Sequence, residues 1–299
     1  MLLQAAHQVA GSQQYPKGAL YLVATPIGNM ADMSLRALHV LSLVDVVACE
    51  DTRVTGQFLR QLGLDKRLVA LHQHNEVESA QGVVALMQDG QRVAYVSDAG
   101  TPAVSDPGAH LVAATQAAGL VVMPLPGASS VTTAMSVAGD THAHGFRFVG
   151  FLPSKGAARL TVLREVLGQP FSVILFEAPH RIEALGAELI EVVPQGRVTV
   201  CRELTKQFED IATIDVLALP AWLQANTHRQ RGEFVLVLHA TPKSDDVQIL
   251  PPAMDALLQE LVRHVPVKLA AGLVADAAGW PRKALYEMAL QHRQQSDSD

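Results

Sequence analysis

The sequence predicts an α/β protein with two α/β domains, a parallel-type sheet followed by a mixed sheet, a cleft between the domains, and a small helical region at the C-terminus. Two observations lead to this prediction. The 299 residues are about twice the usual size of one domain, and 49% of them are hydrophobic, which suffices for two buried cores. Short β-rich runs also alternate with windows of helical periodicity, as in βαβ units.

The first half of the chain reads as five strands separated by helices. The expected strands are 20–24, 46–49, 68–71, 93–96 and 120–125. The expected helices are 34–44, 53–63, 76–88, 107–118 and 129–138. Because a helix follows each strand, the connections are crossovers and the sheet should be largely parallel.

The second half shows the same alternation with one exception. Its expected strands are 146–151, 172–176, 198–201, 211–214 and 233–239, and its expected helices are 156–167, 181–192 and 216–225. No clear helix separates the two strand runs within 197–214, so these runs should form a hairpin and the sheet should be mixed.

Composition shifts divide the chain into five segments. They are a loose N-terminal extension (1–16), a first α/β domain (17–140), a second α/β domain (141–241), a helical region (249–292) and a disordered tail (293–299), with a polar linker at 241–248.

The C-terminal region contains three helical windows, and its last two resemble a helix-turn-helix. Gly279 suits the end of one helix and Pro281 the first position of the next. The alternative is a plain helical appendage that packs on the second domain or on a partner subunit. Five basic against six acidic residues in 250–299 favour this alternative, because the balance is not that of a polyanion-binding surface.

Charge and motif content exclude several classes of function. The net charge of −6 gives no global signal for nucleic acid, so a polyanion would need a local basic patch. Cys49 and Cys201 lie in apolar runs and suit reduced thiols of a cytoplasmic protein. We expect no secretory signal, no membrane span and no metal site, because His72-x-His74 alone is too weak a ligand pattern. P-loop, dinucleotide-binding and zinc-protease motifs are also missing from the sequence.

The loop Ser97–Gly108 carries the strongest sign of ligand binding. It leaves a strand, turns through Gly and Pro, and should enter a helix capped by Ser105 or Asp106, with Pro107 in the first turn. Asp98 can accept hydrogen bonds from a ligand, and Gly100 permits a close backbone approach. A rigid loop with a capping aspartate is the alternative.

Similar loops follow the neighbouring strands and suggest one shared cleft. They are 25–29, 49–53 and 124–130 in the first half, and 176–181 and 201–206 in the second. Single charges in such loops are often ordinary surface or capping residues. Together, the basic side chains of the second half could supply a local positive surface; they are Lys155, Arg159, His180, Arg181, Arg202 and Lys206.

These segments, in this order, resemble the tetrapyrrole methylase-like superfamily of class III S-adenosylmethionine-dependent methyltransferases. The resemblance covers about residues 17–290 and rests on short motifs. They are 20–29, 50–53, 97–102, 106–108, 124–127, 150–153, 177–181, 202–206 and 232–233. Thr25-Pro26-Ile27-Gly28-Asn29 together with Glu50-Asp51-Thr52-Arg53 is similar to the branch of this superfamily that acts on RNA.

The resemblance implies a cytoplasmic homodimer that binds S-adenosylmethionine in the cleft. The implied reaction is 2′-O-methylation of the ribose of a decoding-centre cytidine of 16S rRNA in the assembled small ribosomal subunit. A small-molecule methylase acting on a tetrapyrrole is the first alternative. A non-catalytic rRNA-binding assembly factor on the same fold is the second.

The resemblance also implies where the cofactor binds. The cofactor residues would be Thr25, Pro26, Asp98, Gly100, Thr101, Pro102, Ala103, Ser129, Ser130, Phe176, Ala178 and Gly232. Candidate substrate contacts are Asn29, Glu50, Arg53, Lys155 and Arg181. A ribose hydroxyl is a weak acid, so methyl transfer to it should need a base or a nearby cation. Glu50, Glu177, His180, Lys155 and Lys206 are eligible, and our hypothesis places Glu177, His180, Arg202 and Lys206 on the substrate side as catalytic residues.

Overall fold

The computed structural model describes residues 1–71, 76–105, 107–241 and 252–296. It divides into two compact units, Met1–Pro242 and Lys243–Asp299, which are described separately. The predicted linker and the predicted His72–His74 loop lie largely or wholly outside the described residues.

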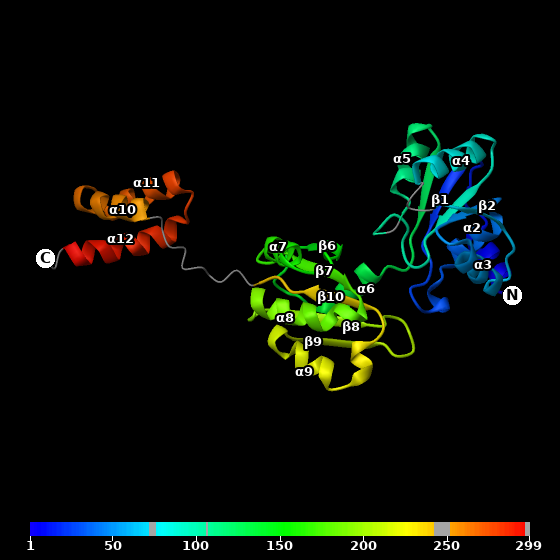
Figure 1. Cartoon of the computed structure of the whole chain (residues 1–299). Helices are drawn as coiled ribbons and strands as arrows, with labels where there is room; N and C mark the ends of the chain where they lie inside the picture. Colours follow the sequence, from blue (N-terminus) through cyan, green and yellow to red (C-terminus); the bar gives the residue numbers. More distant parts are fainter. Residues whose placement is uncertain (72–75, 106, 242–251, 297–299) are drawn as a thin grey trace. The chain divides into compact units, whose positions relative to one another are not determined.

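The first sheet of unit 1 is entirely parallel, as predicted (Figure 1). Its strand order is β3-β2-β4-β1-β5. The strands are β1 (Ala19–Val23), β2 (Val46–Cys49), β3 (Arg67–Ala70), β4 (Val93–Val96) and β5 (Val121–Leu125). The connecting helices are α2 (Leu35–Leu43), α3 (Thr52–Gln61), α4 (Glu76–Gln88) and α5 (Ala109–Ala117), with a short 3₁₀ helix at Met30–Asp32. β2 and β4 are buried throughout, which explains their continuous apolar sequence.

Helices cover both faces of this sheet. Tyr21 of β1 packs in one core with Leu38 of α2 and Leu59 of α3. The neighbouring Leu20 points to the other face, where it packs in a second core with Met87 of α4. Because adjacent strand residues face opposite ways, the strands need apolar side chains at every position.

The structure differs from the sequence-based expectation at the N-terminus. Residues Leu2–Ala10 form helix α1, in place of the expected loose extension. Ala6 and Ala10 are buried, and Ala6 belongs to the same core as Leu38 of α2. Two small residues spaced four apart give a narrow face that permits close helix packing. The periodicity of large apolar residues does not reveal such a helix.

The second sheet of unit 1 is mixed, as predicted. Its order is β6-β7-β10-β8-β9; β6 and β7 are parallel, and the other pairs, including the expected β8–β9 hairpin, are antiparallel. The strands are β6 (Phe146–Phe151), β7 (Ser172–Glu177), β8 (Arg197–Arg202), β9 (Asp210–Asp215) and β10 (Phe234–Leu238). One face packs against α7 (Ala157–Val166), α8 (Ile182–Val192) and α9 (Leu219–Gln224), which lie beside short 3₁₀ helices at Pro179–Arg181, Val216–Ala218 and Thr227–Gln230.

Helix α6 (Ser130–Ala138) covers the other face of the second sheet. Val131 and Ala134 of α6 share a buried core with Ile174 of β7 and Val237 of β10. This helix follows β5 of the first sheet directly in sequence, so its packing connects the two halves of unit 1. The boundaries 17–140 and 141–241 remain our proposal for its domains.

Unit 2 is a small bundle of three helices. They are α10 (Pro252–His264), α11 (Val267–Ala278) and α12 (Arg282–Ser296). Leu258, Val274 and Leu285, one from each helix, are buried in a common core. Gly279 ends α11 in the left-handed conformation (φ 65°), as predicted. Helix α12 continues through part of the expected disordered tail, whose remainder lies outside the described residues.

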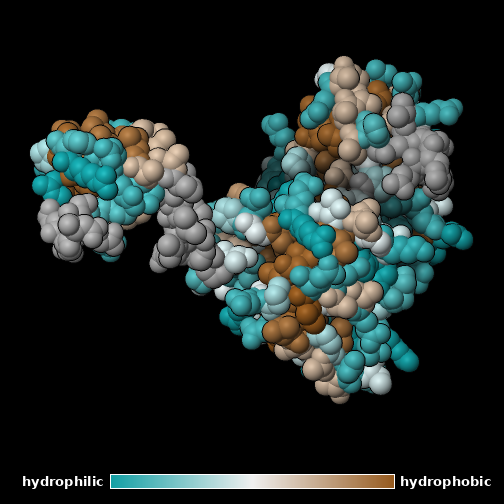
Figure 2. Space-filling view, turned by 60° about the vertical axis from the view of Figure 1, so that its left-hand side comes forward, coloured by the Kyte–Doolittle hydropathy of each residue, from teal (hydrophilic) through white to brown (hydrophobic). Residues whose placement is uncertain are grey.

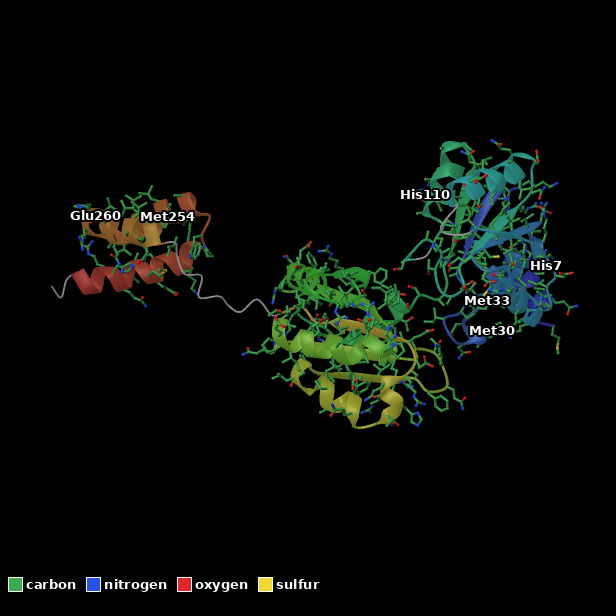
Figure 3. The ribbon with its side chains drawn as sticks, in the orientation of Figure 1. His7, Met30, Met33, His110, Met254 and Glu260 are labelled. Atoms are coloured by element: carbon green, nitrogen blue, oxygen red, sulfur yellow. The ribbon has the colours of Figure 1, made fainter. Side chains whose placement is uncertain are left out.

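The outer surface of unit 2 is mixed in character. Met254 and Glu260 lie on α10 (Figure 3), and Met254 packs against the bundle core. The exposed Glu260 pairs with His264, with 2.9 Å between the nearest carboxylate oxygen and the ring nitrogen. In unit 1 and unit 2 alike, hydrophilic surface alternates with apolar patches (Figure 2). Of the helices in the described parts of the chain, none has the length and apolar content to cross a membrane.

Candidate active site

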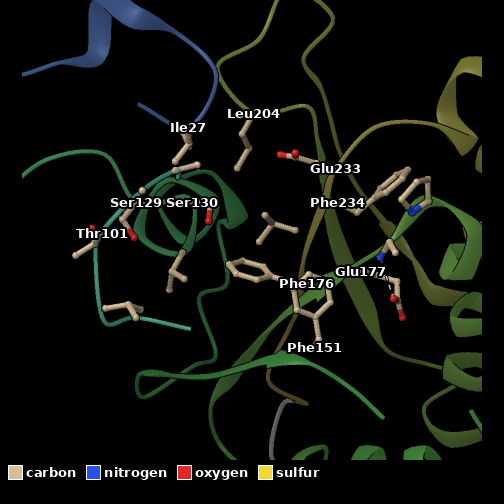
Figure 4. A pocket seen from close by; sticks show the side chains of 17 residues that line it. Ile27, Thr101, Ser129, Ser130, Phe151, Phe176, Glu177, Leu204, Glu233 and Phe234 are labelled. Carbon is tan, nitrogen blue, oxygen red and sulfur yellow. Dashed lines mark hydrogen bonds between the residues drawn. The ribbon is translucent and has the colours of Figure 1, made fainter. Parts of the chain in front are cut away.

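Unit 1 contains a cavity of about 370 Å³ whose walls come from both of its sheets (Figure 4). This is the size of a small-molecule site. Its lining residues are Ile27, Ala99, Gly100, Thr101, Val104, Ser129, Ser130, Val131, Phe151, Phe176, Glu177, Ala178, Pro179, Leu204, Glu233, Phe234 and Val235.

Three loops of the first sheet are tied together at the cavity. The backbones of Thr25 and Gly100 exchange two hydrogen bonds, with N···O distances of 2.9 and 3.0 Å. The Thr25 hydroxyl donates to the Ser97 carbonyl (3.1 Å), and the Thr101 hydroxyl donates to the Ala128 carbonyl (3.0 Å). The loops after β1, β4 and β5 therefore form one rigid wall, as the shared-cleft hypothesis requires.

Two apolar side chains of the cavity lie in strained turns. Val104 is flanked by Ala103 (φ 63°) and Ser105 (φ 69°). Leu204, in the loop after β8, lies between Glu203 (φ 52°) and Thr205 (φ 66°). A left-handed conformation costs a non-glycine residue roughly 1–2 kcal/mol, and such strain gathers at functional sites.

Helix α5 begins later than the sequence predicted. Ala109 is its first residue and Gly108 (φ 126°) its N-cap, so Ser105 does not cap it and Pro107 precedes its first turn. The Pro107 carbonyl instead accepts a hydrogen bond from the hydroxyl of Tyr95 (2.7 Å). The part of this prediction that concerned Asp106 lies outside the described residues.

Glu177 lies at the end of β7 with its side chain fully buried between two guanidinium groups. Its Oε1 is 2.9 Å from Nε of Arg181, and its Oε2 is 3.8 Å from Nη1 of Arg159. Oε1 also accepts a hydrogen bond from the Ala178 N–H (2.9 Å). Arg159 is 2% exposed and pairs with Glu188 as well. Although Glu177 is among the lining residues, its carboxylate is enclosed in a buried ion network and is not exposed in the cavity.

Lys206 lies between two carboxylates. Its Nζ is 2.9 Å from Oε1 of Glu203 and 3.1 Å from Oε2 of Glu233, which lines the cavity. Burial alone would lower the pKa of Lys206, but the hydrogen bonds to both carboxylates outweigh burial and raise it. Lys206 is therefore a fixed cation at neutral pH. A Cβ at Gly28, in the loop after β1, would lie 2.4 Å from Cγ of Lys206, so glycine permits this close contact.

Half of the expected cofactor residues line the cavity. They are Gly100, Thr101, Ser129, Ser130, Phe176 and Ala178. The others, Thr25, Pro26, Asp98, Pro102, Ala103 and Gly232, are not among its lining residues, although most are sequence neighbours of residues that are. Asp98, next to the lining residue Ala99, is exposed, and partial desolvation raises the pKa of its carboxyl.

The expected catalytic and substrate residues are spread more widely. Glu177 lines the cavity, and His180 is exposed three residues beyond it. Arg202 is 8% exposed and donates to the carbonyls of Arg231 and Phe208, at 2.7 and 2.9 Å. The buried positions of Arg202 and Arg159 correct the predicted basic surface, because neither guanidinium can be part of it.

The first-half substrate candidates lie at helix starts. The side chain of Asn29 accepts from the Ala31 N–H and caps the 3₁₀ helix after β1. Asp51 caps α3 and pairs with the exposed Arg53 at 2.7 Å, the ordinary alternative that the sequence left open. Arg53 holds the pKa of Asp51 well below its usual range. In the second half, Lys155 is exposed, and Arg181 contacts Glu177 and the carbonyls of Leu152 and Pro153.

Sequence reasoning missed most of the apolar wall. The missed lining residues are Ile27, Ala99, Val104, Val131, Phe151, Pro179, Leu204, Glu233, Phe234 and Val235. Ile27 and Leu204 lie within motifs 20–29 and 202–206, so these motifs could have identified them as lining residues. The described residues contain no cluster of three or more potential metal ligands among His, Cys, Asp and Glu.

The cavity has the chemistry that S-adenosylmethionine requires. Apolar and aromatic walls suit an adenine ring and the methylene groups of a methionine chain, and hydroxyls of Thr101, Ser129 and Ser130 lie on one side (Figure 4). Ser130 begins α6, so the positive end of a helix dipole faces a carboxylate placed there. Small residues at 99, 100, 129 and 130 leave the space open.

The sequence matches known proteins along nearly its whole length. Residues 19–220 match the family described as Tetrapyrrole (Corrin/Porphyrin) Methylases, and residues 248–293 match the RsmI C-terminal HTH domain. The match of residues 248–293 supports a helix-turn-helix in this region, the interpretation that the charge balance of 250–299 had disfavoured. The protein named Ribosomal RNA small subunit methyltransferase I of Neisseria meningitidis serogroup B is 42% identical, covering 95% of this chain and 97% of that protein. Its namesake from Escherichia coli O157:H7 is 41% identical, covering 96% and 99%.

Solved structures share the fold of unit 1. A cobalt precorrin-4 methyltransferase of cobalamin biosynthesis aligns with a TM-score of 0.54 at 18% identity, covering 75% of this chain and 98% of the other. A uroporphyrin-III C-methyltransferase from Thermus thermophilus, complexed with S-adenosylhomocysteine, aligns with a TM-score of 0.52 at 20% identity, covering 74% and 97%. By its sequence, the chain belongs to the tetrapyrrole methylase family and, within it, to the proteins named ribosomal RNA small subunit methyltransferase I.

Proposed function

We propose that this protein transfers a methyl group from S-adenosylmethionine to the ribose 2′-hydroxyl of a cytidine in 16S rRNA, in the decoding centre of the assembled small ribosomal subunit. Family membership makes the chain an S-adenosylmethionine-dependent rRNA methyltransferase. The ribose oxygen, the cytidine and the decoding centre are the finer parts of the proposal. The observation that carries it is the cavity itself, which joins hydroxyl-bearing loops of the first sheet to aromatic strand ends of the second.

The bound cofactor would supply an electrophilic methyl group on a sulfonium. In the transfer the C–S bond breaks as the C–O bond forms, and the ribose oxygen loses its proton. Alignment of the two reactants provides much of the rate enhancement in such a displacement. The wall formed by the joined loops of the first sheet and the aromatic side chains opposite would impose that alignment.

The structure suggests different roles for the four proposed catalytic residues. Lys206 is held as a cation and would stabilise the developing negative charge on the ribose oxygen. His180 is exposed beside the cavity wall and is the freest of the four to accept a proton. Glu177 and Arg202 are engaged in buried contacts and would support the site from behind.

We further propose that the protein acts as a homodimer in the cytoplasm on the assembled subunit. The net charge of −6 and the burial of Arg159 and Arg202 leave little basic surface for naked RNA. Small subunits should therefore be much better substrates than protein-free 16S rRNA. Equal turnover of the two would contradict this part of the proposal.

The test combines cofactor binding with mapping of the methyl group. Calorimetry should show binding of S-adenosylmethionine, and mass mapping should find a new ribose methyl on one cytidine after incubation with small subunits from cells that lack the protein. Ser130→Leu should abolish both by filling the cavity, whereas Ser136→Leu, on the exposed side of the same helix, should change neither. Folded wild-type protein that binds no cofactor would favour the non-catalytic assembly factor.

A further inference from the structure

Phe151 is a large apolar side chain that the fold exposes at the edge of the cavity. It is 61% exposed, yet it lines the cavity with Phe176 (Figure 4). The innermost lining residues are much more enclosed: Val131 and Val235 are each 7% exposed. An aromatic ring that is half in a ligand cavity and half in solvent is suited to contact a second molecule entering from outside.

The end of β6 is irregular in a way that aims this ring. The register of β6 against β7 shifts between Phe148 and Gly150. Gly150 then adopts φ 73°, and a Cβ there would lie 2.9 Å from the Ser105 hydroxyl oxygen. Irregularities of this kind redirect side chains beside active sites. Here the shift precedes Phe151 directly and brings its strand against the loop that carries Val104.

Other aromatic rings support Phe151 from behind. Its ring centre is 5.6 Å from that of Phe176, at 68° between the ring planes. Phe176 in turn meets Phe148 at 4.9 Å and 61°. These edge-to-face contacts hold the ring of Phe151 in place while much of it stays exposed.

The backbone that follows Phe151 is also fixed. The Arg181 guanidinium donates to the carbonyls of Leu152 (2.8 Å) and Pro153 (3.1 Å). Arg181 itself is held by the buried Glu177. A contact surface organised before binding loses less entropy when the partner arrives, so this clasp favours binding through Phe151.

We propose that Phe151 stacks against the nucleobase of the nucleotide that receives the methyl group. This inference rests on the proposed function and deepens it, because it requires an unpaired base that has left its RNA helix or loop. Single-stranded bases are commonly recognised by stacking on exposed aromatic side chains. The adenine of the cofactor is the other ring that could stack on Phe151. The enclosed part of the cavity, near Val131 and Val235, suits adenine better than the exposed edge does.

The test compares substitutions at Phe151 with a control on the same strand. The KM for small subunits from cells lacking the protein and the Kd for S-adenosylmethionine are measured for Phe151→Ala, Phe151→Leu and Phe151→Trp. The control, Phe146→Ala, removes a 47% exposed ring at the other end of β6, outside the cavity lining. Thermal midpoints of all variants establish that they are folded.

Loss of stacking should raise the KM for subunits about tenfold in the Ala and Leu variants, with the cofactor Kd unchanged within about twofold. Phe151→Trp and Phe146→Ala should behave as wild type. A tenfold weaker cofactor Kd with unchanged subunit KM would overturn the inference and assign the ring to adenine. Unchanged KM and Kd in both the Ala and Leu variants would overturn it outright. Wild-type protein that methylates no subunits would instead refute the proposed function, and this inference with it.

Discussion

Replacement of Arg159 by methionine should destabilise unit 1 strongly. Arg159 is 2% exposed and neutralises two carboxylates, the fully buried one of Glu177 and the 21% exposed one of Glu188. Methionine keeps much of the side-chain volume but leaves both carboxylates without this partner. Removing one member of a buried ion network costs about 3–5 kcal/mol, and the remaining contact of Glu177 with Arg181 favours the lower end, about 3 kcal/mol.

Thermal unfolding measures this effect. For about 150–250 residues, 1 kcal/mol shifts the midpoint by roughly 2–4 °C, so Arg159→Met should lower it by about 6–12 °C. The control is Arg164→Met on the same helix, which breaks a pair with Glu191 whose side chains are 58% and 55% exposed and should cost less than about 1 kcal/mol. Adding Glu188→Gln to Arg159→Met should recover part of the loss. Equal small shifts for the two single variants would refute the reasoning.

Three further substitutions test other parts of unit 1. Gly108→Ala should lower the free energy of unfolding, measured by urea denaturation, by about 2–4 kcal/mol, because the φ of Gly108 is 126° and the new Cβ would lie 2.4 Å from the ring of the buried Tyr95. The control Gly119→Ala (φ 70°, open space) should cost only about 1–2 kcal/mol, and equal costs for the two variants would exclude the clash. Burial and nearby positive charge lower the pKa of His39 below 6.5, so the folded state disfavours the protonated ring and stability falls as pH drops below about 6.5. His39→Leu should therefore reduce the change of the thermal midpoint between about pH 7.5 and 5, and an unchanged slope of midpoint against pH would contradict this. Burial opposes ionisation of Asp140, but hydrogen bonds lower its pKa below 3.8, so the ionised carboxylate stabilises the folded state above that pH and this stabilisation is lost in acid. Asp140→Asn should therefore cost about 2 kcal/mol of stability at pH 7 and progressively less below pH 4. A cost that stays constant with pH would show that the charge of Asp140 is not what stabilises the fold.

Hydrophobic periodicity was enough to predict the strands and the two sheet types. Continuous apolar runs such as 46–49 and 93–96 became fully buried strands, and the missing helix between 201 and 210 correctly signalled a hairpin. Helix α1 was missed because its buried face consists of two alanines. The start of α5 was misplaced because a left-handed glycine, rather than a polar cap, begins it.

The site was harder to predict than the fold, for two physical reasons. Apolar cavity walls such as Val131 and Val235 have the same periodic signature as core residues, and only tertiary structure shows which of them face open space. Charges at strand ends look alike in sequence, although Arg202 is buried against backbone carbonyls and Arg53 is exposed. Gly-rich loops were informative because backbone conformation restricts the residue directly.

The packing of helix α6 also determines where the chain can be cut into fragments. In sequence it completes the first sheet's run of strands and helices, but its apolar side packs on Ile174 and Val237 of the second sheet. A fragment cut at residue 140 would leave that sheet face bare to water and make it prone to aggregation. We therefore expect the two halves of unit 1 to fold well only when they are expressed, or exchanged between relatives, as a single piece.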